Sequence, residues 1–122
     1  MSKDYPFLQI SCRRDYYRLR YPVAQRPRIF IQTHEYVITE LSEKGLRFRT
    51  RYYGDNLPFK MGEEVEGTLV LATATLHVGG TIGRQDDDET VMLDVAGVSF
   101  HRMLEEQRHL ARVCFFGEDF SI

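Results

Sequence analysis

The stretch RIFIQTHEYVIT (residues 28–39) is rich in β-branched and aromatic side chains and predicts the start of an antiparallel β-sheet. We expect one strand over residues 28–33 and a second over residues 36–39, joined at His34-Glu35. A short connection between two such strands is typical of a hairpin. The fold is therefore predicted to be mainly β.

Four further segments repeat this pattern of short strands separated by turn residues such as Gly54-Asp55-Asn56 and Asp86-Asp87-Asp88. Residues 46–52 alternate Leu46, Phe48 and Thr50 with Arg47, Arg49 and Arg51. One face is expected to be shared by Val65, Gly67, Leu69 and Leu71 in residues 65–71, and by Leu76, Val78, Gly80 and Ile82 in residues 76–82. Val91, Leu93 and Val95 are expected to form a last strand over residues 91–95. About six strands with one polar face predict a small, closed or nearly closed antiparallel barrel, because closure removes exposed edges.

The hydrophobic period changes at Ser99, and residues 99–116 predict one C-terminal amphipathic α-helix. Ser99 is expected to cap it. The expected apolar stripe is Phe100, Met103, Leu104, Gln107, Leu110, Ala111 and Cys114, and the opposite face carries Arg102, Glu105, Glu106, Arg108, His109 and Arg112. The stripe is expected to cover one side or mouth of the barrel. The alternative is a helix that recruits a partner protein, for which Phe115, Phe116 and Phe120 would supply apolar surface.

Length and composition fit one domain with a single core, since the chain has 122 residues. No apolar run approaches the roughly 18 residues that span a bilayer, and the first residues contain no apolar signal core. We therefore expect a cytoplasmic protein in which Cys12 and Cys114 are reduced thiols. The sequence predicts neither a metal site nor a catalytic nucleophile, so we expect a protein that is not an enzyme.

Positive charge is concentrated at the start of the chain. Residues 1–28 hold Lys3 and six arginines against Asp4 and Asp15, a net charge of +5, whereas the whole chain carries −2. A local basic segment on an otherwise acidic body favours a compact anion as the ligand. Arginine suits such a ligand because its planar guanidinium binds phosphate, reads the O6/N7 edge of guanine or stacks on a base.

Two sequence motifs indicate more closely which anion is bound. Arg14 and Arg18 form R-x-x-x-R, and Glu40-Leu41-Ser42-Glu43-Lys44-Gly45 follows about twenty residues later. In this order the motifs resemble the PilZ domain family of bacterial cyclic di-GMP receptors, whose signature is R-x-x-x-R followed by [D/N]-x-S-x-x-G. Glu40 stands where that family usually has Asp or Asn.

The resemblance implies a single PilZ-like domain organised as residues 1–27, an Arg-rich segment that clamps the ligand, residues 28–98, the barrel, and residues 99–116, the helix. The implied ligand is cyclic di-GMP, and the implied binding residues are Arg13, Arg14, Arg18, Glu40, Ser42 and Gly45. We expect residues 40–45 to form a turn in which the Glu40 carboxylate and the Ser42 hydroxyl accept from the N1–H and N2 groups of guanine. Gly45 permits positive φ there and brings the backbone close.

Arg13, which directly precedes R-x-x-x-R, leads us to expect two stacked cyclic di-GMP molecules per chain, because the phosphates of a second molecule require additional cations. Binding would change the conformation of the N-terminal tail and signal to a separate protein effector. The main alternative is a PilZ-fold interaction subunit that no longer binds nucleotide, as Glu40 would suggest. A barrel that stacks single-stranded nucleic acid on Tyr16, Tyr17 and Tyr21 is a further option, but the acidic remainder of the chain disfavours it.

Overall fold

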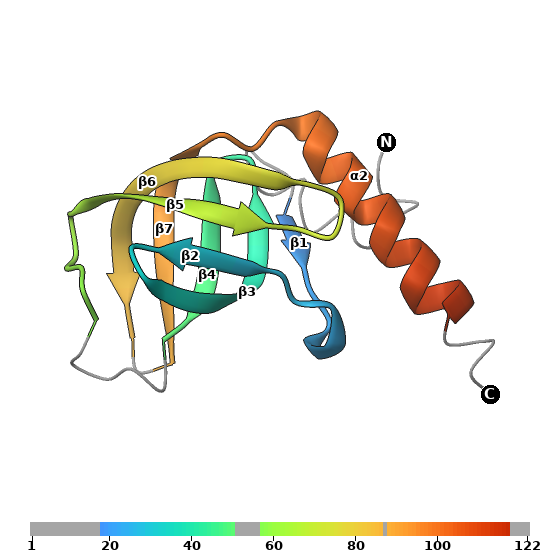
Figure 1. Ribbon diagram of the computed structural model, residues 1–122, viewed down its shortest axis with the longest axis horizontal. Helices are drawn as coiled ribbons and strands as arrows, with labels where there is room; N and C mark the ends of the chain where they lie inside the picture. Colours follow the sequence, from blue (N-terminus) through green and yellow to red (C-terminus); the bar gives the residue numbers. More distant parts are fainter. Residues whose placement is uncertain (1–17, 51–56, 87, 118–122) are drawn as a thin grey trace.

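A computed structural model of the chain describes residues 18–50, 57–86 and 88–117. It contains seven β-strands followed by one α-helix (Figure 1). The strands are β1 (Arg18–Arg20), β2 (Arg28–Ile31), β3 (His34–Ser42), β4 (Gly45–Arg49), β5 (Glu64–Val70), β6 (Thr75–Gln85) and β7 (Glu89–Ala96). A 3-10 turn, η2 (Val23–Gln25), separates β1 from β2, and the helix α2 (Phe100–Ala111) continues into a π-helical turn, η4 (Arg112–Gly117).

Six of the strands close into an antiparallel barrel in the order β3-β2-β5-β6-β7-β4, with β4 pairing back to β3. The predicted mainly β, six-stranded barrel with a C-terminal helix is therefore confirmed. The seventh strand, β1, was not expected, because residues 18–20 fall inside the predicted N-terminal segment. It pairs with residues 40–42, at the C-terminal end of β3.

The two strands β1 and β2 share one edge of β3. Residues 34–37 of β3 pair with β2, and residues 40–42 pair with β1. The chain leaves this edge after β1 and returns for β2, and backbone hydrogen bonds from Tyr21 N to Thr39 O (3.1 Å) and from Ile38 N to Pro27 O (2.9 Å) close the gap. The end of the Arg-rich segment is therefore part of the barrel wall.

The first hairpin turns earlier than predicted. Its connection is Gln32-Thr33, and His34 already belongs to β3, where it pairs with Ile31. The expected junction at His34-Glu35 is wrong because Gln32 adopts a φ of 57°, which gives a two-residue loop the twist that antiparallel strands require.

The core follows the predicted alternation in β4, β5 and β6, where Phe48, Leu69 and Ile82 are almost fully buried. Aromatic rings fill its centre: Tyr36 and Phe48 have centroids 5.2 Å apart, and Phe59 lies 5.9 Å from each of them. Tilted and edge-on contacts of this kind are the preferred aromatic geometry.

The predicted last strand is β7, but Val91 and Leu93 do not form its buried face. Met92 is fully buried instead, whereas Leu93 is 47% exposed. Asp94 has a φ of 52°, and the pairing of β7 with β6 shifts register in this region, so that Val95 returns to the core. The irregularity therefore places Val91 and Leu93 on the outer face of the barrel.

The helix α2 begins as predicted, with the Ser99 hydroxyl accepting a hydrogen bond from Arg102 N at 3.1 Å. It ends at Ala111, earlier than the predicted residue 116, where the π-helical turn takes over. Met103 and Leu110 are buried against the barrel core as expected. Phe100, at the start of the expected apolar stripe, is 50% exposed. Phe120 and the side chains of Phe115 and Phe116 lie outside the described residues.

Glu106 corrects the predicted polar face of α2, because it is only 1% exposed. Its carboxyl group accepts hydrogen bonds from Tyr21 Oη (2.8 Å), Thr73 N (3.2 Å) and Thr73 Oγ1. Tyr21 follows β1 and Thr73 lies in the β5–β6 turn, so these bonds fix the helix beside the end of β1 and beside that turn. Figure 1 shows α2 next to the β5–β6 turn.

No helix in the described part of the chain is long and apolar enough to cross a membrane.

We predict that Glu106→Ala lowers the free energy of unfolding by roughly 2 to 4 kcal/mol, because it leaves several polar groups without their buried partner. Urea unfolding followed by circular dichroism measures this. Glu105→Ala is the control: it removes a partly exposed carboxylate that pairs with Arg102 on the same helix, and it should cost at most about 1 kcal/mol. Equal destabilisation by the two substitutions would contradict this role of Glu106.

Candidate functional site

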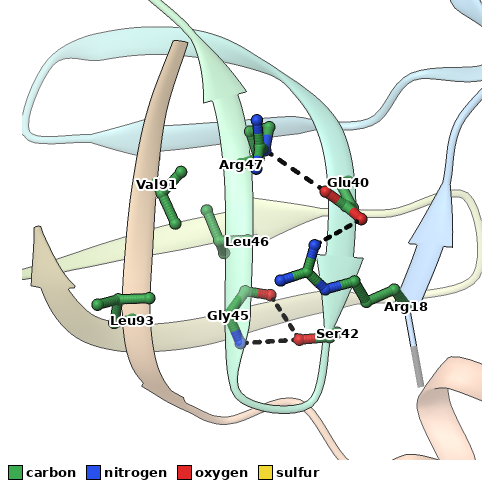
Figure 2. Close-up of a pocket in the computed structure, with 8 residues that line it drawn as sticks. All are labelled: Arg18, Glu40, Ser42, Gly45, Leu46, Arg47, Val91 and Leu93. Carbon is green, nitrogen blue, oxygen red and sulfur yellow. Dashed lines mark hydrogen bonds and ion pairs between the residues drawn. The ribbon is translucent and has the colours of Figure 1, made fainter. Parts of the chain in front are cut away.

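A pocket lies on the outer face of the barrel, where β1, β3, β4 and β7 run side by side (Figure 2). It combines charged side chains with an apolar wall. Its lining residues are Arg18, Glu40, Ser42, Gly45, Leu46, Arg47, Val91 and Leu93. Four of the six predicted binding residues are therefore neighbours. The other two, Arg13 and Arg14, lie outside the described residues.

Arg18 and Glu40 bring the two sequence motifs into contact. Arg18 Nη1 donates to Glu40 Oε2 at 3.2 Å, although the residues are 22 positions apart. The pairing of β1 with β3 sets this distance, because Arg18 stands opposite Ser42 and Arg20 opposite Glu40. The Arg18 side chain keeps 35% exposure, whereas that of Glu40 keeps 12%. The guanidinium is therefore accessible from solvent at the pocket.

A bulge in β3 aims Glu40 into the pocket. Ile38 and Leu41 are both fully buried, so two residues lie between successive inward positions where regular alternation would leave one. The register of β3 against β4 shifts between Ile38 and Glu40. Bulges re-aim side chains in this way. Glu40 consequently belongs to a strand, and the expected turn over residues 40–45 shrinks to Glu43-Lys44.

Arg47 approaches Glu40 from the other side. Its Nε lies 3.4 Å from Glu40 Oε1, and its Nη1 donates to Glu89 Oε1 at 3.1 Å. Arg47 belongs to neither sequence motif and was not predicted as a site residue. The sequence shows that Arg47 follows the second motif closely. It does not show that β4 pairs with β3 and places Arg47 opposite Glu40.

Ser42 shapes the turn between β3 and β4. Its hydroxyl accepts hydrogen bonds from Gly45 N (2.9 Å) and Lys44 N (3.3 Å) and donates to Gly45 O (3.1 Å). One donor and two acceptor positions are the full capacity of a hydroxyl. In this conformation Ser42 therefore fixes the backbone of the pocket floor.

Gly45 is required for space rather than for its backbone conformation. It does not use the positive φ that glycine permits, since Gly62 and Gly97 are the glycines with positive φ in the described part of the chain. A Cβ atom at residue 45 would lie 3.2 Å from the Met92 carbonyl oxygen and 3.7 Å from Ser42 Oγ. Glycine therefore allows β4 to lie close to β7 at the edge of the pocket.

The apolar wall comes from β7, where the irregularity at Asp94 turns Val91 and Leu93 outward. Leu93 packs over Gly83 of β6: a Cβ atom at residue 83 would lie only 2.2 Å from Leu93 Cδ1. These two residues were predicted only to belong to a strand, and nothing in the sequence indicated that they line the pocket. Among the described residues, no group of three His, Cys, Asp or Glu side chains could hold a metal ion.

Comparison with known protein families matches residues 13–116 to the PilZ domain. The chain belongs to the PilZ domain family, a family of cyclic di-GMP receptors and adaptors, as the two motifs predicted.

Among solved structures, the chain is similar to the Bacillus subtilis inhibitor of motility MotI/DgrA, with a TM-score of 0.60 and 15% sequence identity. The match covers 84% of this chain and 52% of that protein, so the chain spans about half of the neighbour's length. At this identity the similarity supports the fold. A search of curated protein sequences found no significant match.

We predict that Ser42→Ala lowers the free energy of unfolding by roughly 1 to 2 kcal/mol, because the partly buried turn amides lose their acceptor. It should also accelerate hydrogen exchange of the Gly45 amide, measured by NMR. Lys44→Ala, in the same turn but exposed, should change stability by no more than about 0.5 kcal/mol. Unchanged exchange at Gly45 in Ser42→Ala would show that the hydroxyl does not hold this turn.

Proposed function

We propose that this chain is a cyclic di-GMP receptor that binds its ligand at the pocket on the outer face of the barrel. The observation that carries the proposal is the contact between Arg18 and Glu40, because it joins one residue of each sequence motif at a single accessible site. Membership of the PilZ family supports the same ligand class.

The chemistry of the pocket fits a guanine nucleotide. Arg18, with Arg14 from the same R-x-x-x-R motif, would bind phosphate or the O6/N7 edge of guanine. Glu40 offers a carboxylate as an acceptor for the base N1–H and N2 groups. Val91 and Leu93 supply an apolar surface on which a base can lie, close to the charged groups.

We further propose that two stacked molecules bind per chain. Two cyclic di-GMP molecules bring four phosphate charges together, and these repel one another unless cations are nearby. Arg13, Arg14, Arg18 and Arg20 would offset this charge, and guanidinium groups can also stack on the exposed faces of the bases.

The output would be a change at the N-terminal segment, which acts on a partner protein. Arg18 lies in β1, so a ligand held by Arg18 is attached directly to the start of the barrel wall. Residues 13–17 precede this strand and include two of the proposed binding arginines. Ligand binding would therefore change the conformation of this segment and the surface available to another protein. The structural neighbour MotI/DgrA is an inhibitor of motility, which is compatible with such an adaptor in a regulatory role.

A second candidate is an interaction subunit that binds no nucleotide. It is favoured by the fact that Glu40 already faces two arginines and that the Ser42 hydroxyl is fully engaged within its own turn. A titration with cyclic di-GMP separates the two candidates.

Isothermal titration with cyclic di-GMP tests the proposal, with GTP and a short oligonucleotide as comparison ligands. We expect cyclic di-GMP to bind most tightly, at two molecules per chain. Arg14→Ala and Arg18→Ala should each weaken binding by roughly 2 to 4 kcal/mol, because each removes a charge-assisted, multi-donor contact.

The melting temperature of the ligand-free variants is the control. Arg18→Ala breaks one partly exposed ion pair, which contributes at most about 1 kcal/mol, so the protein should remain folded. No binding by the folded wild type would favour the interaction subunit, and wild-type affinity in both variants would refute the site. One molecule per chain at saturation would overturn the stacked pair alone.

A further inference from the structure

We propose that Arg47 is an additional ligand-binding residue, which with Arg18 holds one phosphate of the nucleotide in the place that the Glu40 carboxylate occupies in the structure. This inference rests on the proposed function. It adds a residue outside both sequence motifs, supplied by β4.

The first observation is that two guanidinium groups converge on one anionic group. Arg18 approaches Oε2 of Glu40 at 3.2 Å, and Arg47 approaches Oε1 at 3.4 Å, so each guanidinium contacts a different oxygen of the carboxylate (Figure 2). A phosphodiester also presents two charged oxygens, and arginine binds phosphate and carboxylate with the same paired geometry. The arrangement is therefore suited to a phosphate of the ligand.

The second observation is an unsatisfied donor. The Nε atom of Arg47 is buried, and within the described part of the chain it makes no hydrogen bond, because its contact with Glu40 lacks the required geometry. Buried donors without an acceptor are rare and unfavourable. A ligand oxygen with better alignment would satisfy this group.

The third observation is that Arg47 is already positioned. Its Nη1 is held by Glu89 at 3.1 Å, and its side chain is 29% exposed. A side chain whose conformation is fixed before binding loses less entropy when the ligand arrives. When a phosphate replaces the Glu40 carboxylate, one negative charge replaces another, and Glu40 becomes available to accept from the base edge.

The test is titration of the folded variant Arg47→Gln with cyclic di-GMP. We expect affinity to fall about 10-fold to 100-fold, the usual effect of losing one charge-assisted contact, and Arg47→Lys to recover part of it. Arg49→Gln is the matched control, because Arg49 lies two residues along the same strand and face but does not line the pocket. It should bind within about threefold of wild type, since its loss removes a nearby charge but no direct contact with the ligand.

A double variant, Arg47→Gln with Glu89→Gln, separates direct contact from a general loss of positive charge. It has the wild-type net charge, so it should still bind weakly if Arg47 touches the ligand. Wild-type affinity in the double variant, or equal losses in Arg47→Gln and Arg49→Gln, would overturn the inference. If Arg18→Ala weakens binding and Arg47→Gln does not, the proposed function stands and the role of Arg47 alone is refuted.

Discussion

The strand β3 is the constraint on which the rest of this structure depends. It pairs with β2 along its first half, with β1 along its second half and with β4 on its other edge, so it closes the barrel and anchors the Arg-rich segment. A single bulge between Ile38 and Leu41 lets the strand keep both residues in the core while Glu40 points outward. Closure of the fold and assembly of the pocket are therefore consequences of the same nine residues.

Stability and binding depend on different faces of the barrel wall. The interior is filled by aliphatic side chains around Tyr36, Phe48 and Phe59, and the helix is fixed to it by the buried Glu106. The pocket network of Arg18, Glu40, Arg47 and Glu89 lies outside, where partly exposed ion pairs contribute little to folding. Such a separation allows the charged residues to exchange partners when an anion arrives, without loss of the fold.

The sequence was sufficient for the barrel, the helix start and the meeting of the two motifs, because alternation, capping and motif spacing are local signals. It was insufficient where a tertiary contact overrides the local pattern. Asp94 at positive φ reverses the face of Val91 and Leu93, and hydrogen bonds from Tyr21 and Thr73 allow Glu106 to be buried in the helix interface. Arg47 was missed as a site residue because its relation to Glu40 exists only once β3 and β4 are paired.

The central claim is that the ligand lies on the outer face of β1, β3, β4 and β7. The most direct measurement is an NMR titration of ¹⁵N-labelled protein with cyclic di-GMP. We expect the changes in amide chemical shift to concentrate at Arg18, at residues 40–47 and at Val91 to Leu93. The amide shifts of β5, on the opposite wall of the barrel, should stay unchanged. Shifts concentrated on β5 or its neighbours, with residues 40–47 unaffected, would contradict it.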